Sequence, residues 1–321
     1  MKCLIAGAGG FIGGHLMQRL KLEGHQIICA DIKPLSSWFQ IDNKNQNVSM
    51  DLKDYKNCLK VSENVDYVFN LACNMGGMGF IENNKAECML SVLINTNLLR
   101  AGLQNKIKKY YFSSSACVYN ASKQKDTFIN GLKEEDAYPA MPEDGYGWEK
   151  LFSERMCRHF YEDFGLNVRI GRYHNIYGPE GTYDGGREKA PAALCRKIIN
   201  AKLNNENNIE VWGDGQQTRS FLYIDDCIDA TLSVFNSDFR DVFNIGSEEQ
   251  VSINQMIDII EQIADYTVER KYDLSKPKGV RGRSSNNNFI NSNINWSPKY
   301  TLKMGLEKTY NWIHQSLINQ K

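Results

Sequence analysis

The sequence lacks an excess of charge of either sign, because its 38 Lys and Arg residues balance 38 Asp and Glu residues over 321 positions. A balanced chain carries no global field that would attract nucleic acid or an anionic membrane surface. Long apolar runs are also missing, since none approaches the ~18 residues that a membrane-spanning helix needs. We therefore expect neither nucleic acid nor a membrane as a partner, and any anionic ligand has to be held by local groups.

Paired cysteine motifs are absent as well. Nine cysteines are scattered irregularly and none forms a Cys-x-x-Cys pair, which suits free thiols in a reducing compartment. The first six residues carry one positive charge before glycine appears at position 7, so their apolar run is too short for a signal peptide. These features predict a cytoplasmic protein, and we expect no metal site.

The N-terminal segment carries a glycine pattern that follows a short apolar run, Cys3–Ala6, and precedes a helical pattern. A strand, a glycine turn and a helix in this order indicate a dinucleotide site, because the glycines allow a tight turn and close approach to a pyrophosphate. A second strand ends at Asp31, where an acid can bond the ribose hydroxyls and would repel the 2′-phosphate of NADP. NAD is therefore the predicted cofactor, although Lys33 leaves some room for NADP, and a glycine turn without a nucleotide is the alternative. The predicted contacts are Gly7, Gly10, Phe11, Ile12, Gly13, Asp31, Asp51, Leu52, Tyr146 and Lys150.

Alternating strand and helix patterns continue to about residue 175. This alternation predicts an α/β fold with a doubly wound parallel sheet of the Rossmann type. Beyond it the pattern becomes irregular, but segments near 216–246 again resemble parts of the sheet. We predict a cofactor-binding domain over residues 1–175 with these returning segments. Residues 176–215 and 247–321 would form a smaller, discontinuous C-terminal lobe that holds the substrate.

Three serines and a thiol, Ser113–Cys117 with Ala116 between, follow a buried strand at the sheet edge where ligands bind. Tyr146 and Lys150 lie four residues apart on a predicted helix, so both side chains point the same way. An ammonium favours the phenolate, so Tyr146 can take a proton from a substrate hydroxyl while NAD takes the hydride. Ser114 or Ser115 would hold that hydroxyl. The Tyr-x-x-x-Lys spacing is common by chance, but in this context it predicts alcohol oxidation.

The glycine triplet, the Ser–Ser strand end and Tyr146-x-x-x-Lys150 resemble the extended short-chain dehydrogenase/reductase family, with its NAD-dependent epimerases and dehydratases. Longer segments are similar to the GDP-mannose 3,5-epimerase family. They span most of the chain, at residues 75–80, 114–117, 171–178, 185–193, 212–221 and 280–283.

The resemblance implies that bound NAD transiently oxidises carbon 4 of a hexose, which acidifies the C–H bonds at carbons 3 and 5. Cys117 would then act as the base and Lys189 as the acid on the opposite face of the ring. The implied catalytic residues are Tyr146, Lys150, Cys117, Lys189 and Ser115. The implied substrate contacts are Gly76, Gly77, Met78, Ser115, Asn175, Glu188, Lys189, Lys197, Gln217 and Arg281, with Arg283 as a further candidate for the diphosphate. A GDP-sugar substrate and a homodimer through helices at 85–103 and 145–163 are implied too.

Other interpretations remain open from the sequence. A 4-epimerase needs no thiol base, and a 4,6-dehydratase should carry an acid pair where Ala116 and Cys117 stand. A catalytically silent NAD-binding regulator is the alternative from another class. Cys117 could also be an inert buried thiol and Lys189 a surface cation, and the sugar could be mannose, a deoxy-sugar or a heptose.

Overall fold

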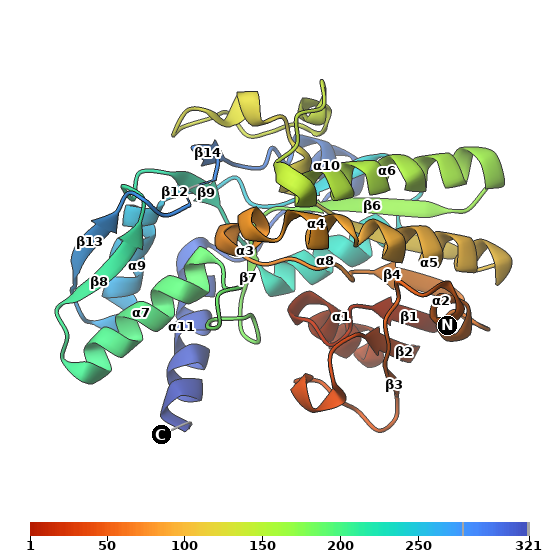
Figure 1. The fold of residues 1–321 in the computed structure, drawn as a ribbon, viewed down its shortest axis with the longest axis horizontal. Helices are drawn as coiled ribbons and strands as arrows, with labels where there is room; N and C mark the ends of the chain where they lie inside the picture. Colours follow the sequence, from red (N-terminus) through yellow and green to blue (C-terminus); the bar gives the residue numbers. More distant parts are fainter. Residues whose placement is uncertain (278, 320–321) are drawn as a thin grey trace.

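A seven-stranded sheet forms the centre of the protein in the computed structural model, which describes residues 1–277 and 279–319 (Figure 1). The strand order is β11-β6-β5-β4-β1-β2-β3 and every neighbouring pair is parallel. The strands are β1 (Lys2–Ala6), β2 (Gln26–Asp31), β3 (Gln46–Ser49), β4 (Tyr67–Asn70), β5 (Lys109–Ser115), β6 (Val168–Tyr173) and β11 (Val242–Ile245). The predicted doubly wound parallel sheet is confirmed. Its order reverses between β1 and β4, the position where such sheets bind ligands.

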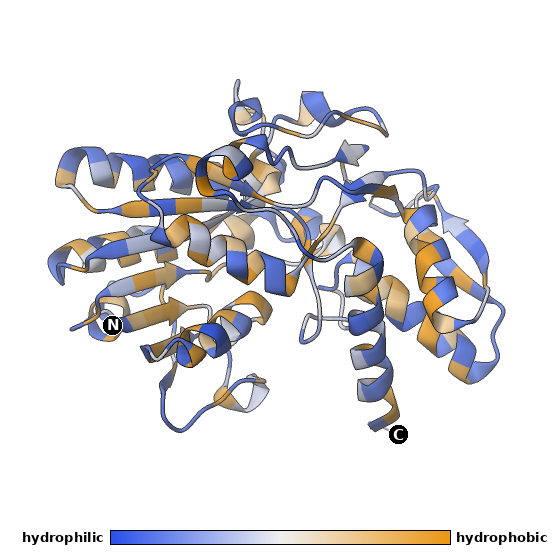
Figure 2. Ribbon diagram, turned by 180° about the vertical axis from the view of Figure 1, so that it is seen from behind, coloured by the Kyte–Doolittle hydropathy of each residue, from blue (hydrophilic) through white to orange (hydrophobic). Residues whose placement is uncertain are grey.

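Both faces of the sheet are buried, because alternate side chains of each strand enter different apolar clusters. Cys3 and Ile5 of β1 pack into one cluster, and Leu4 and Ala6 pack into the other. Helices α1 (Phe11–Leu22) and α8 (Ile224–Asn236) cover one face; α2 (Tyr55–Val61), α5 (Val92–Gln104) and α6 (Asp144–Phe164) cover the other. Strands buried on both sides read as continuous apolar runs, and in Figure 2 the apolar colour concentrates on the strands and on the helix faces turned toward them.

The helix expected over residues 85–103 is instead two helices, α4 (Lys85–Met89) and α5. The break falls at Ser91, whose hydroxyl accepts a hydrogen bond from the backbone N–H of Asn74 at 2.9 Å. Inside α5, Asn95 is fully buried and its carboxamide oxygen accepts a hydrogen bond from the Tyr110 hydroxyl at 2.9 Å. Polar groups that bind the loop and the sheet therefore occupy part of the inward face, while Leu93 remains exposed.

Most of the C-terminal segments gather at one end of the sheet, on the left in Figure 1. Three small sheets pair β7 (Ile176–Tyr177) with β10 (Leu222–Tyr223), β8 (Asn208–Trp212) with β13 (Glu269–Asp273), and β9 (Thr218–Ser220) with β12 (Gln250–Ser252) and β14 (Gly282–Arg283). Helices α7 (Ala190–Asn204), α9 (Ile253–Ala264) and α11 (Leu302–Asn319) pack on one another. Short helices are α3 (Met78–Asn83), α10 (Asn288–Ile294) and the 3-10 turns η1 (Leu35–Ser37), η2 (Ala116–Val118), η3 (Ala121–Gln124) and η4 (Glu134–Ala137). The proposed domain boundaries stay a prediction.

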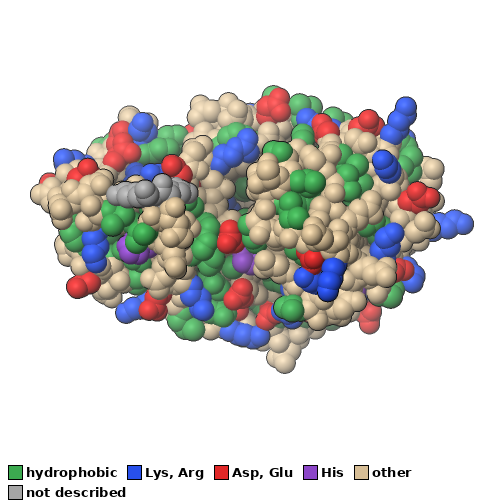
Figure 3. Space-filling view, turned by 90° about the horizontal axis from the view of Figure 1, so that it is seen from below, with side chains coloured by type: hydrophobic (Ala, Val, Ile, Leu, Met, Phe, Trp, Pro, Cys, Tyr) green, Lys and Arg blue, Asp and Glu red, His purple; other side chains and the backbone are tan. Residues whose placement is uncertain are grey.

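Positive and negative side chains are mixed on the surface, as expected from their equal numbers in the sequence. Lys and Arg side chains are interspersed with Asp and Glu on the face seen in Figure 3, without a patch of one sign. Within residues 1–277 and 279–319, no helix combines the length and apolarity that crossing a bilayer requires.

Candidate active site

The glycine turn between β1 and α1 has the close approaches that a dinucleotide site needs. Gly7 has a φ of +87°, and a Cβ there would lie 2.8 Å from the backbone of Leu71 and Ala72 at the end of β4. A Cβ on Gly13 would collide with the carbonyl oxygen of Gly7. The N-cap of α1 is Gly10, which offers no side-chain cap, so the first N–H groups of the helix are available to a phosphate.

Asp31 stands at the tip of β2, where the sequence placed the ribose ligand. One carboxylate oxygen accepts a hydrogen bond from the backbone N–H of Lys33 at 3.0 Å. The ammonium of Lys33 donates to the carbonyl oxygen of Gly9 at 3.2 Å, so it lies over the glycine turn. This arrangement leaves a carboxylate facing the ribose position and fits NAD better than a 2′-phosphate.

One cavity of about 640 Å³ joins the glycine turn to three of the predicted catalytic residues, Ser115, Tyr146 and Lys189, whereas Cys117 and Lys150 do not line it. This volume lies within the range of small-molecule and cofactor sites. Its walls include Gly7, Gly10, Phe11, Ile12, Gly13, Asp31, Asp51, Leu52, Cys73, Gly76, Ser115, Tyr146 and Lys189. The structure therefore brings the predicted cofactor turn, the serine, the tyrosine and the lysine of α7 to one chamber.

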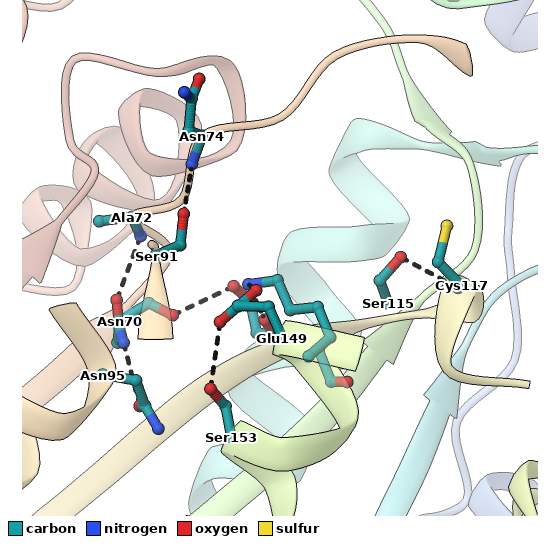
Figure 4. Close-up of polar contacts among 12 residues, drawn as sticks. Asn70, Ala72, Asn74, Ser91, Asn95, Ser115, Cys117, Glu149 and Ser153 are labelled. Atoms are coloured by element: carbon teal, nitrogen blue, oxygen red, sulfur yellow. Dashed lines mark hydrogen bonds and ion pairs between the residues drawn. The ribbon is translucent and has the colours of Figure 1, made fainter. Parts of the chain in front are cut away.

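Tyr146 and Lys150 are both buried on α6 beside β5. The Lys150 ammonium donates to the carbonyl oxygen of Ser113 at 3.0 Å and lies 5.7 Å from the centre of the Tyr146 ring. Burial by itself lowers the pKa of Lys150, but the charges of Cys73 and Glu149 outweigh it and raise that pKa. Lys150 therefore stays charged. The neighbouring Glu149 carboxylate accepts a hydrogen bond from the Ser153 hydroxyl at 3.1 Å (Figure 4).

The phenol of Tyr146 is protonated in the protein alone, because burial raises its pKa well above the ordinary value. The Ser115 hydroxyl interacts with the phenol and opposes this rise. Lys150 and the positively charged nicotinamide ring of oxidised NAD are the cations that would favour the phenolate when cofactor and substrate are bound.

The structure distinguishes the two serines at the end of β5. The Ser114 hydroxyl donates to Glu154, whose carboxylate forms a buried bidentate pair with Arg172 at 2.8 Å for both contacts. The Ser115 hydroxyl instead accepts from the backbone N–H of Cys117 at 3.2 Å (Figure 4). Ser115 is thus the serine that accompanies Tyr146, whereas Ser114 fixes α6 to the sheet.

Cys117 lies in η2, one turn beyond β5, in a small apolar cluster with Tyr146 and Cys88. Burial raises the pKa of its thiol and the charge of Glu143 raises it further, whereas the Arg283 guanidinium lowers it. Cys117 is 9% exposed, which leaves an edge of the side chain open.

Lys189 is the N-cap of α7 and is half-buried. Burial lowers the pKa of its amine, and Cys117, when it is a thiolate, is the largest effect that opposes this. Lys189 lines the same cavity as Tyr146, and Tyr146 packs in one cluster with Cys117, although Lys189 and Cys117 are 72 positions apart in the sequence. An amine of lowered pKa is suited to donate a proton near neutral pH.

Comparison with known proteins identifies the family. The NAD dependent epimerase/dehydratase family matches residues 3–246. The chain belongs to this family. NAD is its cofactor, and it is an enzyme of the epimerase type.

The relatives extend over the whole chain. The GDP-mannose 3,5-epimerase of Arabidopsis thaliana is 46% identical over 322 residues, covering 100% of this chain and 84% of the relative. The UDP-glucose 4-epimerase of Thermotoga maritima, solved with UDP-glucose, superposes with a TM-score of 0.89 at 23% identity, over 99% of this chain and 100% of that one. The UDP-glucuronic acid 4-epimerase of Bacillus cereus, solved with UDP-glucuronic acid and NAD, gives 0.83 at 26% identity, over 98% and 100%.

In this epimerase, the loop after β4 that contains Gly76 and Gly77 lies against the segment that carries Lys189. Gly77 donates its N–H to the carbonyl oxygen of Arg187 at 3.0 Å, and a Cβ on Gly77 would collide with the carbonyl oxygen of Glu188. Met78 begins α3 just beyond this contact. Glycine is needed here because two backbones meet, and the contact aligns the loop after β4 with the start of α7.

Two other predicted substrate residues present unpartnered buried oxygens. Glu188 pairs through one oxygen with Arg196 at 3.3 Å, and its other oxygen has no hydrogen-bond partner among the described residues. Gln217 donates to the carbonyl oxygen of Trp212 at 3.0 Å, and its own carboxamide oxygen is likewise unsatisfied within residues 1–277 and 279–319. Buried acceptors without a donor are suited to sugar hydroxyls.

The remaining predicted substrate ligands are held by protein groups. Asn175, with a φ of +46°, donates to the carbonyl oxygen of Ser220 at 2.9 Å. Lys197 donates to the carbonyl oxygen of Glu210 at 2.7 Å, and Arg281 lies 2.8 Å from a carboxylate oxygen of Asp214. Like Glu188 and Gln217, these residues do not line the described cavity, so their roles as ligands stay predictions.

The sequence did not single out Cys73, Glu143 or the contact between Arg283 and Cys117. Cys73 lines the cavity and influences the pKa of Lys150, and its place just beyond a strand end was a signal that could have found it. Glu143 and Arg283 are 140 positions apart and meet at Cys117, which no local pattern indicates.

Proposed function

We propose that this epimerase inverts carbons 3 and 5 of GDP-mannose. The observation that carries the proposal is the place of Tyr146: it lies beside Lys150, lines one cavity with Lys189, and packs in one apolar cluster with Cys117. The relatedness to a GDP-mannose 3,5-epimerase at 46% identity supports the choice of substrate.

The oxidation pair acts first. NAD, which the glycine turn and Asp31 would hold, would supply the acceptor and later the donor of the hydride of carbon 4. Tyr146 takes the proton of the 4-hydroxyl, which Ser115 holds, and Lys150 keeps the phenolate accessible by its charge. Because the cofactor is regenerated in each turnover, it needs no exchange with solvent.

The resulting ketone makes the neighbouring C–H bonds acidic enough for a side chain to remove their protons. Cys117 takes a proton from one face to leave a sugar enolate, and Lys189 returns a proton from the other face, which inverts the carbon. Ala116 and Cys117 occupy the place where a dehydratase would need acids, and a simple 4-epimerase would need neither the thiol nor the amine.

The preference for GDP rests on the relative and on the resemblance of the C-terminal segments. The lobe formed by 176–215 and 247–321 would hold the nucleotide, with the unpartnered oxygens of Glu188 and Gln217 available to hydroxyls. Nine free cysteines support a cytoplasmic location, where thiols stay reduced.

Incubation with GDP-mannose in deuterated water tests the function. We expect deuterium at both carbon 3 and carbon 5 of the recovered sugar, detected by mass spectrometry and proton NMR. Label at carbon 5 with loss of the 6-hydroxyl would indicate a dehydratase instead. Absence of label with GDP-mannose, together with label in a deoxy-sugar or heptose analogue, would correct the substrate and keep the chemistry.

A homodimer through α4, α5 and α6 is part of the proposal. These helices pack on one another, and their large exposed apolar side chains include Met89, Leu93, Trp148 and Phe152, with Leu90 exposed between α4 and α5. Trp148 and Phe152 are four residues apart on α6, so they share one face, and such a patch marks an interaction surface.

Sedimentation should give twice the chain mass for the native protein and the chain mass for a Trp148→Glu, Phe152→Glu double variant. Phe128→Glu is the matched control, because Phe128 is more exposed and lies outside these helices. A native protein that sediments as a monomer at micromolar concentration would remove the dimer from the proposal.

A further inference from the structure

Each nitrogen of the Arg283 guanidinium contacts a protein group at or near Cys117. Its Nη1 lies 3.7 Å from the Cys117 sulfur, its Nη2 lies 2.8 Å from a carboxylate oxygen of Glu143, and its Nε donates to the Gln124 carboxamide oxygen at 2.7 Å. Arg283 is 3% exposed. A guanidinium used in three directions inside the protein has little left for a diphosphate, so the sequence-based assignment of Arg283 to the diphosphate is not favoured.

The backbone around Arg283 is built to reach this position. β14 pairs with β9, and the N–H of Arg281 donates to the carbonyl oxygen of Gln124 at 2.9 Å. A Cβ on Gly282 would collide with the carbonyl oxygen of Asp126. Glycine therefore lets the segment pass against the loop after η3 and sets the next side chain, that of Arg283, against Cys117.

Glu143 is fixed to Cys117 by its own backbone. It is the N-cap of α6, and its N–H donates to the carbonyl oxygen of Cys117 at 2.9 Å. A Cβ on Gly147 would collide with that same carbonyl oxygen, so the first turn of α6 can lie directly on η2. Glu143 and Arg283 thus approach the thiol from opposite ends of the sequence.

We propose that Arg283 and Glu143 are positioning residues that set the charge of Cys117, with the guanidinium holding the thiolate and the carboxylate holding the guanidinium. The proposal rests on the proposed role of Cys117 as the base.

Both charge states of the thiol are accommodated by this arrangement. When Cys117 is a thiolate, Arg283 faces two negative groups. When the thiolate has taken a proton from the sugar, the S–H bond has formed, the C–H bond has broken, and Glu143 still balances the buried guanidinium. Without Glu143 the proton transfer would leave Arg283 as an uncompensated buried charge, which is strongly unfavourable.

The two residues act in opposite directions on the thiol. Arg283 lowers the pKa of Cys117 and Glu143 raises it, against the larger rise that burial causes. The other charged or titratable groups that face Cys117 or its cluster are Tyr146 of α6, Arg219 of β9, Lys189 at the start of α7, Cys88 of α4 and Cys73 after β4. These groups are unchanged in the two variants below. If the two variants shift the pKa of Cys117 in opposite directions, the shifts are therefore due to Arg283 and Glu143.

The test is the pH dependence of alkylation of Cys117 by iodoacetamide, measured on the full-length protein by mass spectrometry of the peptide that contains it. Arg283→Gln should slow alkylation at neutral pH by about tenfold or more, because losing an adjacent opposite charge moves a pKa by about 1–3 units. Glu143→Gln should accelerate alkylation by about threefold to tenfold, because a like charge is removed while the shape is kept. Glu149→Gln is the matched control, a buried carboxylate of the same helix that lies beside Lys150.

Opposite shifts in the two variants, with no shift in the control, support the proposal. Equal shifts of the same sign, or shifts no larger than that of Glu149→Gln, overturn it. If Arg283→Gln fails to fold, Arg283→Lys keeps the charge without the forked guanidinium, and its alkylation rate should fall between the native rate and the rate expected for Arg283→Gln. The direction of the change in alkylation rate in Glu143→Gln still tests the proposal by itself.

The outcome is separate from that of the proposed function. Thiol alkylation needs no sugar, so opposite shifts with no deuterium exchange would keep the charge arrangement and reject the epimerase. Deuterium exchange without the shifts would keep the epimerase and reject the role of Arg283 and Glu143.

Discussion

Replacing Tyr146 with Phe should lower the rate of GDP-mannose epimerisation by about a hundredfold to ten-thousandfold, the range that a positioned general acid–base contributes. The phenol is the group placed to take the 4-hydroxyl proton, with the Lys150 ammonium 5.7 Å from its ring centre. Without that proton transfer carbon 4 is not oxidised, so no ketone forms. Deuterium exchange at carbons 3 and 5 should fall together with the absorbance of reduced cofactor that appears on adding substrate.

Tyr161→Phe is the matched control for this change. Tyr161 lies on the same helix, and its ring faces the Arg240 guanidinium at 4.2 Å, away from the described cavity. Its variant should keep the native rate. Cofactor reduction at the native rate in Tyr146→Phe would show that another group accepts the hydroxyl proton and would remove Tyr146 from its role.

The cofactor half of the site could be predicted from the sequence because each of its signals is local. The glycine turn, the acid at the end of β2 and the tyrosine–lysine pair are defined by short spacings, and short spacings fix geometry in a turn or a helix. Gly13 owes its identity to a backbone approach within the first βαβ unit, and Gly7 needs a positive φ, although its close contacts come from the residues after β4. The structure therefore brings them into the same cavity with Tyr146.

The surroundings of the thiol could not be predicted in this way. Cys117, Glu143 and Arg283 meet only because β14 pairs with β9 and the first turn of α6 lies on η2. Such pairings depend on the tertiary fold rather than on spacing. The break at Ser91 has the same origin, because a hydroxyl that binds the loop after β4 outweighs the helical pattern of 85–103.

The same distinction explains why the two serines had to await the structure. In a strand, neighbouring side chains point to opposite faces, so only one of Ser114 and Ser115 can accompany Tyr146. The buried Arg172–Glu154 pair decides which one, since it takes the Ser114 hydroxyl. That pair comes from α6 and β6 and is not visible from the serine motif itself.

Replacing Cys117 with Ala should separate the two chemical steps. Deuterium exchange at the carbon served by the thiol should fall by about a hundredfold or more, because the general base is lost. Cofactor reduction on adding GDP-mannose should persist, because oxidation at carbon 4 precedes proton removal and Tyr146, Lys150 and Ser115 remain. Parallel measurements of label by NMR and of reduced cofactor by absorbance would show this uncoupling.

Cys88→Ala is the matched control, because Cys88 is a fully buried thiol of the same apolar cluster and is separated from Cys117 by 29 positions. Its loss should leave both exchange and cofactor reduction near native levels, apart from a modest loss of stability. Lys189→Met should resemble Cys117→Ala in keeping cofactor reduction while losing inversion, because the amine acts on the same ketone from the other face. Native exchange in Cys117→Ala would place the base elsewhere, and Cys73, which lines the cavity beside Lys150, would be the next thiol to replace.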